Sequence, residues 1–307
     1  MSIPPSAPSY GVGVAARGAI IAGVACYTLW GLLPLYLLAV AAAGPAPLEV
    51  IAHRALWSVP WAGLLVLMAR QGGHSIQVLK TPRTLGLLAA SALLIGGNWT
   101  LYVWAVAHGR VLEGSLGYYI NPLMNMAAGA LLFRERLDWV GWSAIGLAAL
   151  GVCVQTVALG HPPYVSLVLA MTFTGYGLIR KQVAAEAQTG LFVECLVLAP
   201  LALAYILWLG QTGAGYFLTR PSPTILLLLA GPVTVVPLML FSWAARRLPL
   251  STIGFLQFIG PTMGFVIGVA NGERLTLLRM VSFGFIWAGV VVFAVGAWRK
   301  TRGLPAG

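Results

Sequence analysis

Polar side chains interrupt several long apolar segments of this chain, and these side chains are the candidates for chemistry. One segment contains Tyr118, Asn121 and Asn125 at spacings of three and four residues, which places all three on one face of a helix. An amide surrounded by hydrocarbon costs free energy unless it is hydrogen-bonded, so this face is expected to look into the protein or into a wet cavity. Hydrogen bonding between helices explains the same pattern equally well.

Arg54 is the charged residue whose position most clearly indicates a functional role. It lies within another apolar segment, on the face shared with Ser58 and Trp61. A guanidinium inside a membrane helix costs up to about 3 kcal/mol on insertion scales, and it is by default a functional hypothesis. We expect Arg54 to bind an anionic group or to pair with Glu49 or Glu194; snorkelling of the side chain to the outer interface is an equal alternative.

Other apolar segments contribute further candidates. The predicted substrate-binding residues are Trp30, Arg54, Asn98, Tyr102, Tyr118, Asn121, Asn125, Tyr176, Trp243 and Gln257. Their aromatic rings suit an aromatic or amphipathic substrate with few charges, and they equally suit a well-packed helical bundle. Glu49, His53 and Glu194 are candidates for proton coupling. Solvation of the two carboxylates near helix ends, and a structural hydrogen bond from the histidine, are the competing interpretations.

Motifs of enzymes and metal sites are not found. The sequence contains no GxSxG, GxxxxGK or HExxH pattern, which argues against an enzyme and against ATP-driven transport by this chain alone. The three cysteines, Cys26, Cys153 and Cys195, have neither CxxC spacing nor neighbouring His and Asp, so neither a zinc site nor a disulfide framework is expected. No cofactor is predicted.

The composition explains where these polar residues must work. Of 307 residues 59% are hydrophobic and only 8% are charged, about a third of the share in ordinary globular domains, and the mean hydropathy is +0.89. A soluble protein is therefore excluded. The net charge of +11 does not require nucleic acid as a partner, because basic residues accumulate in the cytoplasmic loops of membrane proteins.

Apolar runs long enough to cross a bilayer recur along the whole chain. An all-α integral membrane protein is predicted, with ten transmembrane helices at residues 18–42, 46–69, 85–107, 112–133, 139–159, 164–180, 190–210, 224–245, 250–271 and 279–298. With ten spans both termini share one side, and that side holds 13 of the 18 basic residues against four on the other. This bias predicts that both termini are cytoplasmic.

The chain also contains a weak internal repeat. Trp30-Gly31 followed by Glu49 corresponds to Tyr176-Gly177 followed by Glu194, and Glu135-Arg136-Leu137 corresponds to Glu273-Arg274-Leu275. An odd number of five spans per copy inverts the second copy in the membrane, which is a common plan of secondary transporters. The predicted organisation is a disordered tail at 1–16, repeats at 17–160 and 161–300, and a cytoplasmic tail at 301–307.

Several strings are specific enough to identify a family. Leu94-Ile95-Gly96-Gly97-Asn98-Trp99, the stretch from Glu113 to Leu123, and Ala187-Gln188-Thr189-Gly190 resemble the EamA-domain family of the drug/metabolite transporter superfamily, with similarity over about residues 17–300. The resemblance implies two inverted EamA repeats of five helices each, a central cavity lined by both, and a bacterial inner membrane. It supplies no settled set of substrate residues.

The leading hypothesis is a secondary transporter or permease that moves small organic metabolites or drugs, such as amino-acid-like or aromatic compounds, in the direction of export by alternating access. A membrane scaffold or sensor without flux is the main alternative, and an integral-membrane lipid enzyme is a weaker one. The expected partners are a small-molecule substrate and the lipid bilayer. Glycines in the fifth and tenth spans suit either intrachain packing or a homodimer face: Gly141, Gly146, Gly151, Gly284 and Gly289.

Overall fold

Residues 10–132, 138–245, 247–248 and 256–301 are described by a computed structural model, and in these ranges every regular element is a helix. The first half contains α1 (Tyr10–Ala43), α2 (Pro47–Met68), α3 (Gly72–Leu79), α4 (Pro82–Ala107), α5 (Val111–Leu132) and α6 (Trp139–Leu159). The second half contains α7 (Tyr164–Gln182), α8 (Ala187–Thr212), α9 (Pro221–Ala245), α11 (Ile259–Ala270) and α12 (Leu277–Thr301).

Proline and glycine mark many of the helix ends. Pro47 and Pro82 occupy the start of α2 and α4, where the missing N–H would have no helical partner in any case. At the other end, α6 and α8 are followed by Gly160 and Gly213 with φ of 71° and 68°, a left-handed conformation that glycine adopts without a Cβ clash. The long helices are therefore joined by short connections and make up most of the structure.

Seven helices are long and apolar enough to cross a membrane: α1, α2, α4, α6, α8, α9 and α12. Shorter apolar helices occur at Tyr164–Arg180, within α7, and at Ile259–Ala270, which is α11. The chain is therefore a multi-pass helical membrane protein. Three features differ from the expected spans. Helix α1 begins at Tyr10, inside the expected tail, and the connection after α2 contains the short helix α3. The ninth span was expected at 250–271, but α11 begins at Ile259 after a turn at 257–258, and residues 250–255 lie outside the described ones.

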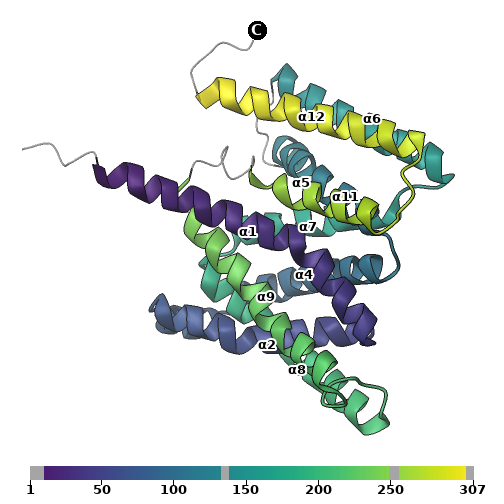
Figure 1. Cartoon of the computed structure of the whole chain (residues 1–307). Helices are drawn as coiled ribbons and strands as arrows, with labels where there is room; N and C mark the ends of the chain where they lie inside the picture. The colour runs from purple at the N-terminus through teal and green to yellow at the C-terminus, as the bar shows by residue number, and fades with distance from the viewer. Residues whose placement is uncertain (1–9, 133–137, 246, 249–255, 302–307) are drawn as a thin grey trace, which may run out of the picture.

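The helices pair in a pattern that survives exchange of the two halves (Figure 1). Helix α1 packs on α9 and α11, and α7 packs in the same way on α4 and α5. Helix α2 packs on α9 as α8 packs on α4. Three further pairs, α2 with α8, α5 with α11 and α6 with α12, each join one helix of either half. In Figure 1 the α6–α12 pair lies at one end of the molecule and the α2–α8 pair at the other.

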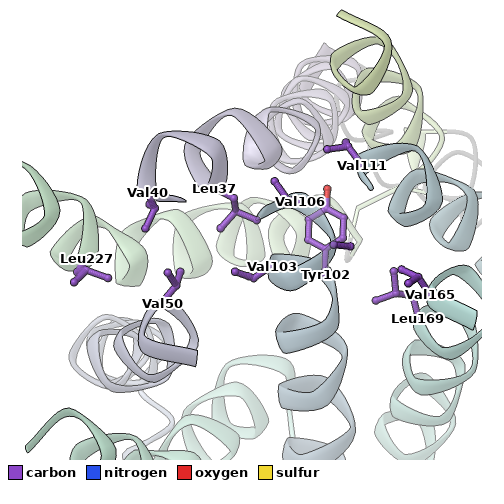
Figure 2. Close-up of a cluster of buried hydrophobic side chains, with 11 residues drawn as sticks. Leu37, Val40, Val50, Tyr102, Val103, Val106, Val111, Val165, Leu169 and Leu227 are labelled. Carbon is purple, nitrogen blue, oxygen red and sulfur yellow. The ribbon is translucent and has the colours of Figure 1, made fainter. Parts of the chain in front are cut away.

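The largest apolar cluster fills the space between helices of both halves (Figure 2). Its labelled members are Leu37, Val40, Val50, Tyr102, Val103, Val106, Val111, Val165, Leu169 and Leu227, each at most 6% exposed. They belong to the last turns of α1 and α4 and to the first turns of α2, α5, α7 and α9. The cluster therefore closes the bundle at one end of these helices, and we call it the apolar seal.

Glycines allow α6 and α12 to approach closely. A Cβ on Gly289 would lie 2.9 Å from the carbonyl oxygen of Ala144, and one on Gly151 would lie 2.9 Å from that of Ser282. The Ser282 hydroxyl donates to the Gly151 carbonyl at 2.8 Å. These two glycines serve packing within the chain. Gly284 has open space around it, so the homodimer face remains a proposal for the outer surface of this pair.

The difference between Gly289 and Gly284 gives a matched test. Gly289→Ala is expected to lower the melting temperature in detergent, because the added methyl meets backbone that cannot move aside; overpacking of this kind costs about 1–3 kcal/mol. Gly284→Ala adds the same methyl to open space and should leave the melting temperature unchanged. Equal effects of the two changes would contradict the packing of α6 on α12.

Candidate central site

Arg54 is buried between helices rather than exposed at an interface with water. Its side chain comes from α2, and the residue is 4% exposed. The guanidinium Nε donates to the Thr234 hydroxyl of α9 at 3.1 Å, and its Cζ lies 4.6 Å above the ring of Trp99 in α4. The phenols of Tyr36, Tyr102 and Tyr118 are within electrostatic range. Arg54 thus joins helices of both halves, and snorkelling does not explain its position.

The charge of Arg54 has no carboxylate partner among the described residues. Glu49 and Glu194, the partners expected from the sequence, bond elsewhere, and neither forms an ion pair with this guanidinium. The Nη1 atom is buried and has no hydrogen-bond partner. A guanidinium keeps its proton in proteins, so a full positive charge with a free donor stands inside the bundle.

A hydrogen-bonded junction adjoins this charge. The side-chain amide of Asn98, which is fully buried, donates to the Leu169 carbonyl and to the Thr172 hydroxyl, both at 2.9 Å. Its carbonyl accepts from the Tyr118 hydroxyl at 3.1 Å, and the Tyr118 and Tyr102 rings meet edge to face at 5.2 Å. Asn98 therefore ties α4 to α5 and α7, so interhelical bonding accounts for part of the polar pattern.

Asn121 lacks the hydrogen bonds that Tyr118, on the same face of α5, forms. It is fully buried, yet neither its amide nitrogen nor its amide oxygen has a hydrogen-bond partner. Buried amides are normally satisfied, so one that is not calls for an explanation such as a binding role. The side chain of Asn125 lies outside the described residues.

A second polar cluster is built around Glu194 on α8. Its carboxylate accepts from the hydroxyls of Ser91 and Tyr176, and Arg180 approaches it at 3.9 Å. An edge contact from Tyr118 to Phe173 and a tilted contact from Phe173 to Tyr176 connect this cluster to the surroundings of Arg54. Tyr176 thus lies with Glu194 rather than on Arg54.

Glu49 and His53 lie at the start of α2 and brace the loop that follows α8. The Glu49 carboxylate accepts from the backbone N–H groups of Tyr216 and Phe217 at 2.7 and 3.2 Å. His53 Nδ1 accepts from the Trp57 indole at 2.9 Å, and its Nε2 is buried without a partner. Both residues have structural contacts, and proton coupling stays a prediction.

Three sequence candidates lie away from Arg54. Trp30 packs against Tyr27 and Phe241, at centroid distances of 5.5 and 5.9 Å. Trp243 is 40% exposed, and the Arg247 guanidinium carbon lies over its ring, 4.4 Å from the ring centroid. Gln257 is partly buried in the turn before α11.

Several contacts of the site were not predicted from sequence. Thr234, Tyr36 and Trp99 were not among the predicted site residues. Thr234 is the one hydroxyl residue within the apolar run 225–241 of α9, and this is the signal that could have pointed to it. In the described part of the chain, no group of three His, Cys, Asp or Glu side chains could hold a metal ion.

Comparison with known proteins gives consistent results. The model of the EamA-like transporter family matches residues 17–157. An uncharacterized transporter of Pseudomonas aeruginosa is 44% identical over 292 residues, 94% of this chain and 97% of that protein. Protein RarD of Escherichia coli K12 is 41% identical over 283 residues, covering 92% and 95%. The chloramphenicol-sensitive protein RarD of P. aeruginosa is 29% identical, covering 83% and 87%.

One solved crystal structure supports the fold. It superimposes with a TM-score of 0.58 at 19% sequence identity and covers 92% of this chain and 99% of the other. At this level of identity the similarity concerns the fold alone.

The Asn98 junction predicts unequal effects of two substitutions. Tyr118→Phe removes one interhelical hydrogen bond, which in membrane proteins contributes about 0.6 kcal/mol on average. Asn98→Ala removes all three bonds of the junction and should lower the free energy of unfolding several times more. Thermal unfolding of both variants in detergent measures the difference; equal losses would contradict Asn98 as the junction of α4, α5 and α7.

Proposed function

The chain belongs to the EamA-like transporter family, and we propose that it is a secondary transporter that exports small organic molecules across the bacterial inner membrane by alternating access. A membrane transporter follows from the family and its relatives. The substrate class, the direction and the mechanism are our proposal. The single observation that carries it is the meeting of both halves at Arg54, through Thr234 of α9 and Trp99 of α4.

The proposed transport unit consists of two inverted repeats, at residues 17–160 and 161–300, with five spans each. Support comes from the helix pairing, which is the same after the two halves are exchanged. Two units of opposite orientation can rock about a shared site and expose it to each side in turn. The close approach of α2 and α9 fits such a pivot, because a Cβ on Gly231 would lie 2.5 Å from the carbonyl oxygen of Trp57.

The apolar seal is the proposed outer gate. Its members occupy the ends of α1 and α4 and the starts of α2, α5, α7 and α9, the ends that carry the predicted periplasmic loops. Arg54 lies four residues beyond Val50 along α2 and is buried beneath the seal. In this conformation the central site is closed toward the periplasm, and export requires the seal to open.

Loop contacts are consistent with the proposed orientation. Gly44, between α1 and α2, lies against the ring of Tyr216 between α8 and α9. On the opposite side the Thr189 hydroxyl donates to the Gln71 side chain at 3.0 Å, which links the connection after α2 to the first turn of α8. Loops predicted to share a side of the membrane therefore touch. The excess of basic residues assigns the Gln71 side to the cytoplasm.

A scaffold or sensor is the competing function, and flux separates the two. We expect Asn121→Leu to abolish transport in proteoliposomes without lowering the melting temperature, because the buried amide has no partner to lose and an apolar replacement of similar size fits the same space. Amino acids, aromatic metabolites and chloramphenicol form the panel, each tested with and without a pH gradient.

Asn98→Ala provides the matched control for this experiment, because it should lower stability through its known bonds. Flux that persists in Asn121→Leu would remove Asn121 from the site. No flux of any compound by folded wild-type protein would favour the scaffold.

Orientation is tested by cysteine labelling in a background without the three native cysteines. Gly73→Cys, at an exposed position with open space, should react with an impermeant maleimide only after spheroplasts are permeabilised. Arg220→Cys, exposed at the start of α9, should react in intact spheroplasts. The reverse pattern would place the termini in the periplasm.

A further inference from the structure

We infer that the transported substrate is an organic anion whose carboxylate binds Arg54 and whose aromatic body lies against Trp99, Tyr102 and Tyr118. This inference rests on the proposed transport function and specifies its substrate class. It starts from a buried guanidinium with a free donor at the junction of the two halves.

An inventory of the acidic residues leaves the charge of Arg54 unbalanced. The chain has seven Asp and Glu residues, and Glu135 lies outside the described part. Glu113 forms two hydrogen bonds of 2.8 Å with Arg110, and Glu273 accepts from the Leu112 N–H. Glu49 and Glu194 are engaged as described above, at the two ends of the bundle.

The remaining acids, Asp138 and Glu186, also have partners: the Gly141 N–H and the Gln71 amide. Every described carboxylate is thus accounted for without Arg54. Isolated buried charges are costly and are normally paired, so a ligand that brings its own anion completes this site.

The same inventory argues against a zwitterionic substrate. An α-ammonium group beside the bound carboxylate would add a second positive charge, and none of the described carboxylates pairs with Arg54 to balance it. It would also be repelled by the guanidinium itself. The aromatic rings offer stacking and edge contacts to an uncharged body, with Trp99 at 4.6 Å from the guanidinium carbon. A monoanion with an apolar body therefore fits better than an amino acid.

Arg54 is not part of the framework that the two repeats share. The offset that relates Glu49 to Glu194 relates Arg54 to Ala199. The second half thus builds its equivalent helix without a charge at this depth, and packing alone does not require one. The arginine is a feature added to one half, at the place where both halves can contact a ligand.

Three probes of one skeleton test the inference: phenylpropionate, phenylalanine and phenethylamine, titrated by calorimetry into the purified full chain. Phenylpropionate should bind at least about tenfold more tightly than phenylalanine, and phenethylamine should not bind. Arg54→Met should weaken phenylpropionate binding by about tenfold or more, and Arg54→Lys should restore part of it.

The melting temperature of Arg54→Met separates a binding role of Arg54 from a structural one, because loss of a structural residue would lower it. Arg54→Met removes an unpaired buried charge and should leave the melting temperature unchanged or raise it. The matched control Arg110→Met strips Glu113 of its partner, so it should lower the melting temperature and leave phenylpropionate affinity unchanged. A large loss of stability in Arg54→Met, with binding retained, would overturn the inference.

The outcomes separate the anion site from the transport function. Flux of phenylalanine or chloramphenicol that survives Arg54→Met would overturn the anion site while transport stands. Arg54-dependent binding of phenylpropionate without flux beyond that of protein-free liposomes would support the site and contradict transport. Binding of chloride with no preference for the aromatic anion would reveal an inorganic-anion site and overturn the proposed substrate class.

Discussion

The positive charge of Arg54 inside an apolar bundle is the constraint on which the account depends. A charge at the centre of a membrane helix costs about 2.5–3.5 kcal/mol on insertion scales, and dispersion contacts in the rest of the bundle must offset it. The surrounding helices lessen the cost with a hydroxyl from Thr234 and the face of Trp99. Neither supplies a negative charge, and an anionic ligand is the partner that we propose for it.

The rest of the structure holds the two halves around this charge. Close backbone contacts, such as those at Gly231 and Gly289, make α2–α9 and α6–α12 tight pairs. Glu49 and Glu194 correspond in the repeat expected from the sequence, and their bonds differ. The Glu49 carboxylate accepts from backbone N–H groups of a loop, and the Glu194 carboxylate accepts from side-chain hydroxyls. The apolar seal lies at the end of the bundle that Glu49 occupies, and Val50 beside Glu49 belongs to it. Both halves thus form the helical framework, whereas Arg54 and Trp99 of the proposed site come from the first half.

Sequence predicted the helical elements much better than the site. Apolar runs located α2 and α8 to within a few residues, because crossing a membrane imposes length and composition directly. The short helix α3 has no such signal and was missed. Arg54 was conspicuous as a charge in an apolar run, but the sequence left open whether its side chain is buried or snorkels to the interface. Its contact with Thr234 depends on how α9 crosses α2. Asn98 was singled out correctly as needing a partner, but Leu169 and Thr172 follow only from packing.

A crystal structure with bromophenylpropionate bound tests the central claim most directly, because the anomalous signal of bromine locates the aromatic body independently of the carboxylate. The account predicts carboxylate density within hydrogen-bond distance of the Arg54 Nη1 atom and bromine among Trp99, Tyr102 and Tyr118. A carboxylate bound elsewhere, with Arg54 turned to pair with Glu194, would contradict it.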